Sequence, residues 1–207
     1  MTAVALYGPP PAGKATPPAA LSAADSRFEL LTKLKQGTGR SAGYRFITEE
    51  ELDDLRSQDR VLVETRRYGN VYVVERHSLE GPQRRGKVPV VHMGNVTDLR
   101  TMLAGTESEW LRVLLWVPRD VCEQRSRQRD DTDTAKRLHA WDETARDILD
   151  SDLRDLFDLV VRTDTVEPEE AAREIATALG GPVSARLPAE VRKSLDLTGP
   201  GTALPGG

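Results

Sequence analysis

Several features that often reveal the class of a protein are missing from this sequence of 207 residues. One cysteine excludes an internal disulfide and a zinc site built from cysteines, and the three histidines lack the spacing of a metal site. No apolar run approaches the roughly 18 residues that a membrane-spanning helix needs. Residues 1–7 have no basic start and no cleavage site. We therefore expect no signal peptide and no membrane contact, with a reducing cytoplasm as the location.

An excess of positive charge is missing as well. The 29 Lys and Arg residues against 33 Asp and Glu residues give a formal net charge of −4, which argues against general nucleic-acid binding. Apolar residues make up 38% of the chain and charged residues 30%, which is typical of a soluble globular domain. After residue 180 the composition shifts to Pro, Gly, Ala, Ser and Thr. We expect one domain over 1–180 and a mostly disordered tail over 181–207.

Short apolar runs alternate with helical patterns between residues 4 and 179. The predicted strands lie at 4–7, 28–31, 61–63, 71–74, 88–93, 112–117 and 157–161. The predicted helices begin near 19, 48, 96, 119, 135 and 168, and a polar loop is predicted over 80–87. Thr48 and Glu51 form a capping box at the start of one helix. This alternation predicts an α/β protein with a mostly parallel sheet and helices on both faces.

The first predicted strand runs into a candidate phosphate-binding loop. Gly8 to Ala15 match G-x-x-x-x-G-K through Gly13 and Lys14, with Ala15 where a Ser or Thr belongs. Such a loop curls backbone N–H groups around phosphate oxygens, and Lys14 would reach the β- and γ-phosphates. Its three prolines supply no N–H donors and Ala15 offers no hydroxyl to Mg²⁺, although Thr16 can still donate to a phosphate. The alternative interpretation is a proline-rich turn that binds nothing.

A second anion-binding candidate is the glycine-rich, basic segment from Lys35 to Arg45. Its glycines permit close backbone approach, and Lys35, Arg40 and Arg45 supply positive charge. A phosphorylated sugar or a nucleotide analogue would suit this segment.

Taken in order, several segments of residues 4–179 resemble the guanylate kinase family of P-loop nucleoside-monophosphate kinases. Lys35 falls where the family has an arginine that grips the acceptor phosphate, and Tyr44-Arg45-Phe46 resembles its Tyr-x-Phe segment. Leu62-Val63-Glu64 resembles the strand whose glutamate reads guanine. Gly69-Asn70-Val71-Tyr72 resembles Gly-Asn-Tyr-Tyr, whose last tyrosine contacts the acceptor phosphate. Together with the cations of the basic segment, the resemblance gives the predicted acceptor-binding residues, which are Lys35, Arg40, Tyr44, Arg45, Glu64 and Tyr72.

The resemblance extends to the lid. Arg125-x-x-x-Arg129 and Arg137-Leu138 resemble the arginines that close over the transferred phosphate, so Arg125, Arg129 and Arg137 join Lys14 as catalytic candidates. The fold it implies is P-loop kinase-like, in three layers, with an acceptor-binding subdomain over about 33–80 and a lid over about 122–137. The activity it implies is phosphoryl transfer from ATP, with Mg²⁺, to a small phosphorylated acceptor.

One departure from the family bears on the substrate. Residues 90–95 contain no acid where the family has an acidic pair that helps to hold Mg²⁺ and the acceptor; Asn95 and Asp98 are the available substitutes. We therefore expect an acceptor other than GMP, for which the ribose bisphosphate kinase of phosphonate breakdown is a precedent within the group. Two alternatives stay open: a catalytically inactive kinase-like scaffold, and a nucleotide-binding regulator with weak affinity for ATP. The oligomeric state also stays open.

Overall fold

The computed structural model describes residues 2–9, 16–39, 41–67, 69–128, 134–150 and 156–181, with the backbone alone for residues 16–19. Within these residues the strands form two sheets, a larger parallel one in the order β2-β7-β1-β8-β9 and a smaller mixed one in the order β4-β3-β6-β5. The strands of the larger sheet are β1 (Thr2–Tyr7), β2 (Phe28–Leu30), β7 (Val88–His92), β8 (Glu109–Trp116) and β9 (Leu159–Arg162). Those of the smaller sheet are β3 (Lys33–Gln36), β4 (Tyr44–Phe46), β5 (Val61–Arg67) and β6 (Asn70–Glu75).

Strand β1 lies at the centre of the larger sheet. It pairs in parallel with β7 on one side, where Leu6 is opposite His92, and with β8 on the other, where Thr2 is opposite Glu109. Its residues from Ala3 to Tyr7 are all buried, as expected for a parallel strand covered on both faces. The carboxyl ends of β1, β7 and β8 therefore meet at one edge of the sheet.

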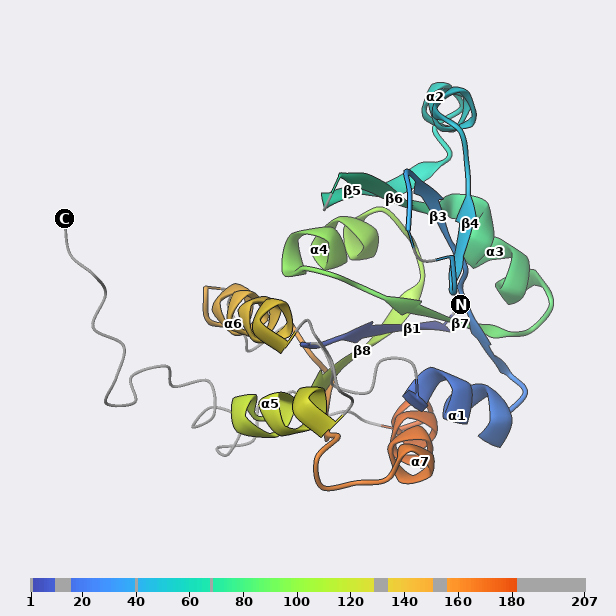
Figure 1. Ribbon diagram of the computed structural model, residues 1–207. Coiled ribbons are helices and arrows are strands. Elements are labelled where there is room, and N and C mark those ends of the chain that lie inside the picture. The colour runs from blue at the N-terminus through green and yellow to red at the C-terminus, as the bar shows by residue number, and fades with distance from the viewer. Residues whose placement is uncertain are drawn as a thin grey trace.

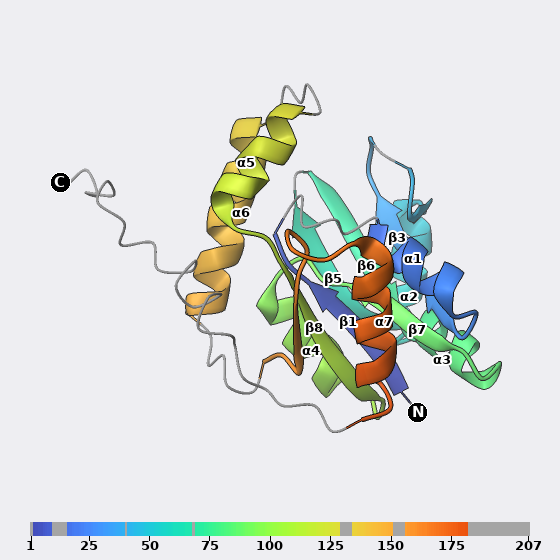
Figure 2. The ribbon, with the colours of Figure 1, turned by 90° about the horizontal axis from the view of Figure 1, so that it is seen from below.

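The helices complete a three-layer arrangement. They are α1 (Thr16–Ala24), α2 (Glu49–Ser57), α3 (Arg76–Arg84), α4 (Val96–Ala104), α5 (Arg119–Gln128), α6 (Thr134–Leu149) and α7 (Pro168–Ala178). Helix α4 lies between the two sheets, whereas α1, α5 and α7 lie on the other side of the larger sheet (Figure 1). Seen from below, α1 lies beside α7 and α5 beside α6 (Figure 2). No helix within the described ranges is long and apolar enough to cross a bilayer.

Two hydrophobic clusters hold these layers together. In the main core, the rings of Trp116 and Trp141 lie 5.2 Å apart, and Trp141 Nε1 donates to the carbonyl oxygen of Val117 at 2.9 Å. The second cluster fixes α2 on the smaller sheet and consists of Leu34, Ile47, Leu52, Leu55, Val71 and Val73. The predicted capping box starts α2, with Thr48 Oγ1 accepting from the Glu51 N–H at 3.1 Å and the Thr48 N–H donating to Glu51 at 2.7 Å.

The prediction of a polar loop over 80–87 is wrong for its first part, because α3 continues to Arg84. Gly81 and Pro82 are both weak helix formers. Pro82 lacks an N–H for the carbonyl of Ser78, yet it is buried together with Leu79 one turn earlier. Burial of this apolar face overrides the low helix propensity of Gly and Pro. Strands β3 and β4 were also not predicted, and the other predicted elements are present with ends shifted by a few residues.

Candidate active site

The candidate phosphate loop begins at the carboxyl end of β1. Gly8 has φ +153°, and a Cβ added there would lie 2.1 Å from the carbonyl oxygen of Leu115. Only glycine fits this exit from the sheet. Helix α1 begins at Thr16, so the chain has the strand–loop–helix order that the motif requires. Of the predicted ATP contacts, Gly13, Lys14 and Ala15 lie outside the described residues, and of Thr16 only the backbone is described.

The predicted lid arginines belong to the pair of helices α5 and α6. Arg125 Nη2 donates to the carbonyl oxygen of Thr163 at 2.5 Å, which ties α5 to the segment after β9. Burial raises the pKa of the Cys122 thiol to about 11, and the charges of Arg119, Arg137 and Arg125 oppose that rise. Two predicted catalytic arginines therefore lie on the same helix pair. Arg129 lies outside the described residues.

Three aromatic rings surround the ammonium group of Lys35. Its Nζ lies 5.6 Å from the ring centroids of Tyr44 and Tyr72 and 5.1 Å from that of Phe46. The two tyrosine rings are themselves 5.3 Å apart. Lys35 is 3% exposed, so its charge lies in a largely dehydrated environment where it attracts an anion more strongly than in water. The structure thus brings together three of the predicted acceptor contacts.

The side chain of Asn70 fixes the backbone of the basic segment just after Lys35. Asn70 Oδ1 accepts the N–H of Thr38 at 2.7 Å. A Cβ on Gly37, which has φ +129°, would lie 2.1 Å from that same oxygen, so a larger residue would strain the backbone and displace the Asn70 side chain. Arg45 is exposed and lies 3.8 Å from Glu51, away from the Lys35 cage. Arg40 lies outside the described residues.

Register places the side chains of the smaller sheet on two opposite faces. Lys35 is opposite Tyr72, which is opposite Thr65, so these three share one face. Glu64 is opposite Val73, whose side chain belongs to the cluster under α2. Because successive side chains in a strand alternate between faces, Glu64 points away from Lys35 and Tyr72. The structure therefore does not bring Glu64 together with the other predicted acceptor contacts.

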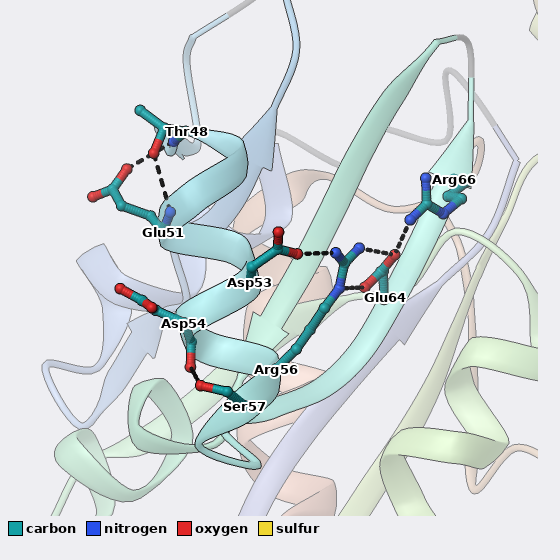
Figure 3. A network of polar contacts seen from close by, with 8 residues as sticks. All are labelled: Thr48, Glu51, Asp53, Asp54, Arg56, Ser57, Glu64 and Arg66. Atoms are coloured by element: carbon teal, nitrogen blue, oxygen red, sulfur yellow. Dashed lines mark hydrogen bonds and ion pairs between the residues drawn. The ribbon is translucent and has the colours of Figure 1, made fainter.

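Glu64 instead anchors helix α2 (Figure 3). Its two carboxylate oxygens accept from Nε and Nη2 of Arg56 at 2.9 and 2.8 Å, and Arg66 lies 2.9 Å from the same carboxylate. Arg56 also bonds Asp53 at 2.6 Å on its own helix. The hydrogen bonds from Arg56 hold the pKa of Glu64 below its usual range. Glu64 therefore joins β5 to α2, on the face of the smaller sheet that α2 covers.

A cavity of about 330 Å³ opens where the carboxyl edge of the larger sheet meets β5 and α6. Tyr7 lies in its wall, and the tyrosine hydroxyl donates to Asp147 Oδ2 of α6 at 2.8 Å. The same oxygen accepts the N–H of Val96, the first residue of α4, at 2.7 Å. Burial, followed by the bond to Asp147, raises the pKa of Tyr7 well above its usual value. Arg67 and Glu143, joined at 2.6 Å, form another part of the wall.

A polar cluster beside this cavity joins the smaller sheet to α4. Asp98 of α4 accepts from the hydroxyl of Thr65 and, at 2.8 Å, from Asn95 Nδ2. Withdrawal from water lowers the pKa of Lys33 to about 8, although the charge of Asp98 opposes this. Lys33 and Lys35 alternate with buried Leu34 on β3, so both lysines point to the face that carries Thr65.

A larger cavity, of about 620 Å³, lies elsewhere, between α3 and residues 104–108. Residues 104–108 lead into the amino-terminal end of β8. The strand rise of about 3.3 Å per residue places this end roughly 20 Å from the exit of β1. Ligands of parallel α/β sheets bind at the carboxyl ends of the strands, so we assign the site to the smaller cavity.

Sequence reasoning missed two features of this site. Asp147 reaches the end of β1 from a helix 140 residues later, and no pattern in the sequence indicates that contact. Sequence reasoning selected Glu64 as an acceptor contact and did not identify its neighbour Thr65, which lines the cavity. The strict alternation along β5, read from the pairing with Tyr72, is the signal that distinguishes them.

Comparison with solved structures finds chains that are similar to this one. A guanylate kinase from Anaplasma phagocytophilum matches with a TM-score of 0.57 and 14% identity, over 86% of this chain and 84% of that one. The tunicamycin resistance protein of Deinococcus radiodurans matches with a TM-score of 0.46 and 14% identity, over 90% of this chain and 100% of that one. No sequence-family model and no curated protein matches the chain.

The chain has a P-loop kinase-like fold, an α/β architecture with a parallel central sheet, as the sequence predicted. Within that class it is similar in fold to a guanylate kinase. At 14% identity the likeness concerns the fold, and the chemistry has to be argued from the residues of this chain.

Proposed function

We propose that this protein is an ATP-dependent phosphotransferase of guanylate kinase-like type, acting on a nucleotide or another phosphorylated small molecule other than GMP. The observation that carries the proposal is the dehydrated ammonium group of Lys35 inside its aromatic cage. It lies on the same face of the smaller sheet as Thr65, which lines the cavity at the carboxyl edge of the larger sheet. A fixed cation beside a cavity suits an acceptor that carries a phosphate.

Phosphoryl transfer depends mainly on positioning and on neutralising charge spread over the phosphoryl oxygens. In our assignment, Lys14 and the backbone of the loop after β1 hold the phosphates of ATP. Lys35, Tyr44 and Tyr72 hold the phosphate of the acceptor. Arg125 and Arg137, with Arg129, neutralise the charge that develops during transfer.

The described residues are compatible with Mg²⁺ that is held mainly by the phosphates of ATP and by water. Within the described ranges no three His, Cys, Asp or Glu side chains cluster as metal ligands. Mg²⁺ keeps several waters and binds through substrate phosphates with one or two carboxylates, so it does not need such a cluster. It would enter with the phosphates of ATP and supply charge neutralisation. Asp98 is the carboxylate near residues 93–95, where β7 ends.

Calorimetric titration of the full chain with ATP and Mg²⁺ tests the nucleotide side of the proposal. Lys14→Ala removes the loop cation and is expected to weaken binding at least tenfold. Lys87→Ala is the matched control, because Lys87 bonds the carbonyl oxygen of Ser26 at the opposite edge of the sheet. Equal affinity in all three proteins, or no binding by the folded wild type, would contradict the proposal.

A binding protein without transferase activity is the second candidate. One observation favours it: Asp98, which stands nearest to the position of the missing acidic pair, already accepts hydrogen bonds from Thr65 and Asn95. This candidate predicts binding of phosphorylated ligands with no ADP formed from ATP.

A further inference from the structure

Gly39 lies beside the ammonium group of Lys35. A Cβ added to Gly39, which has φ +89°, would lie 3.7 Å from Lys35 Nζ. Apart from the two chain neighbours of Gly39, no other described residue has an atom within 4 Å of that position. The space on this side of the ammonium is therefore left open by a glycine, and a side chain at residue 39 would enter it.

The aromatic cage does not fill this space. The rings of Tyr44, Phe46 and Tyr72 have their centroids 5.1 to 5.6 Å from Lys35 Nζ, but none of their atoms lies within 4 Å of the Cβ position at Gly39. An oxygen that accepts from an ammonium lies about 2.7 to 2.9 Å from its nitrogen. A methyl group at 3.7 Å from Lys35 Nζ would therefore compete with such an oxygen for the same room.

The backbone before Gly39 is fixed relative to Lys35. The N–H of Thr38 donates to Asn70 Oδ1 at 2.7 Å, and Asn70 is the first residue of β6. Two residues further along the same strand, Tyr72 is the cross-strand neighbour of Lys35. The position of Gly39 beside the ammonium is thus set by the pairing of β3 with β6 and by one hydrogen bond from the preceding residue.

We propose that the phosphate of the acceptor reaches Lys35 on the side of Gly39, and that Gly39 is a specificity-determining residue because its missing side chain keeps this approach open. The inference rests on the proposed function, because it takes Lys35 to bind the acceptor phosphate. It goes further by assigning the side of approach and the residue that controls it.

Gly43 offers a matched control within the same basic segment. It has φ +86°, close to the φ of Gly39, and a Cβ added there meets nothing within 4 Å. Alanine at either position therefore imposes a similar backbone strain, and aspartate at either position changes the net charge equally. Only the variants of Gly39 place new atoms beside Lys35 Nζ. We expect Gly39→Ala and Gly43→Ala to shift the melting temperature alike.

Titration of the ¹⁵N-labelled full chain with inorganic phosphate, without ATP, tests the inference. The amide resonance of Tyr72 reports on the Lys35 cage separately from phosphate bound at the loop after β1. We expect this resonance to shift in the wild type and not in Lys35→Met. Gly39→Ala is expected to weaken the fitted affinity about fivefold, because a methyl group takes the place of a phosphate oxygen.

The aspartate variants sharpen the comparison. Gly39→Asp is expected to weaken the affinity more than about tenfold, because its carboxylate pairs with the ammonium. Gly43→Ala and Gly43→Asp are expected to stay within about twofold of the wild type, because they add nothing at the ammonium. Wild-type affinity in both Gly39 variants, or equal losses in the Gly39 and Gly43 variants, would overturn the inference. A Tyr72 resonance that phosphate does not shift in the wild type would overturn it as well.

Failure of this inference is distinguishable from failure of the proposed function. The expected pattern of phosphate affinities without any phosphoryl transfer from ATP would leave the inference standing and contradict the proposed function. Phosphoryl transfer to an acceptor with phosphate affinities that ignore Gly39 would do the reverse.

Discussion

The hydroxyl of Tyr7, the last residue of β1, donates a hydrogen bond to Asp147 of α6 over 2.8 Å. The same carboxylate oxygen accepts the first N–H of α4, from Val96, at 2.7 Å. One carboxylate thus joins the central strand β1, helix α4 between the two sheets and helix α6. The negative charge lies at the amino-terminal end of α4, where the helix dipole favours it. This junction forms one wall of the cavity.

Replacing Tyr7 by Phe is expected to lower the free energy of unfolding by about 1 kcal/mol, because one largely buried hydrogen bond is lost while the ring still packs. Urea denaturation measures this change. Val96 continues to bond Asp147 in the variant, so α4 keeps its position and circular dichroism is expected not to change. A variant as stable as the wild type would show that the hydroxyl contributes nothing at the junction.

Neighbouring residues on β5 are expected to behave differently because they point to opposite faces. Glu64→Gln weakens the contacts with Arg56 and Arg66 and is expected to lower the melting temperature slightly, with no effect on the affinity for the acceptor. Thr65→Val is expected to weaken acceptor binding at least tenfold. Differential scanning fluorimetry and calorimetric titration of both variants test this pair. The reverse pattern would mean that Glu64 contacts the acceptor.

Stability is expected to depend on pH through Lys33. The pKa of Lys33 in the folded protein is about 8, below the unfolded value of about 10.4. Between these values the folded state binds fewer protons than the unfolded state, so the free energy of unfolding rises with pH. The contribution from Lys33 is expected to rise by about 1 kcal/mol from about pH 7 to about pH 9. Urea denaturation of the wild type and of Lys33→Met at several pH values isolates the contribution of Lys33. An equal pH dependence of the free energy of unfolding in both proteins would contradict the prediction.

Two glycines with positive φ allow a matched comparison of strain and steric clash. Gly43→Ala, at φ +86° with nothing within 4 Å of the new Cβ, is expected to cost about 1 kcal/mol of stability from strain alone. Gly8→Ala adds a clash 2.1 Å from the carbonyl oxygen of Leu115 and is expected to cost more than about 2 kcal/mol. Thermal or urea denaturation gives both values. Equal costs would mean that the chain relaxes freely at the exit of β1.

The fold class could be predicted because it depends on local patterns. Buried strands such as 112–117 and capped helices such as the one at Thr48 are visible along the chain. The candidate site was harder to predict, because it depends on how the strands pair with one another. Whether Glu64 or Thr65 faces the cavity is decided by which residue stands opposite Tyr72, and the sequence alone does not reveal that register.

Contacts between distant segments were also hidden from the sequence. Asp147 meets Tyr7 only because α6 packs beside the end of β1. Pro82 stays within a helix because its ring is buried, which a reading of local propensity cannot detect. The cage around Lys35 assembles from three strands, although its members had been recognised one at a time by their resemblance to a family pattern.

The most direct test of the account is acceptor-dependent formation of ADP from ATP and Mg²⁺ by the purified full chain. The reaction is run with sugar phosphates and nucleoside monophosphates in turn, and the phosphorylated product is identified by ³¹P nuclear magnetic resonance. The account predicts that one phosphorylated acceptor stimulates ADP formation, and that Lys14→Ala and Lys35→Met each abolish the stimulation while Lys87→Ala keeps it. ADP formation that no acceptor stimulates, or that survives both lysine substitutions, would contradict it.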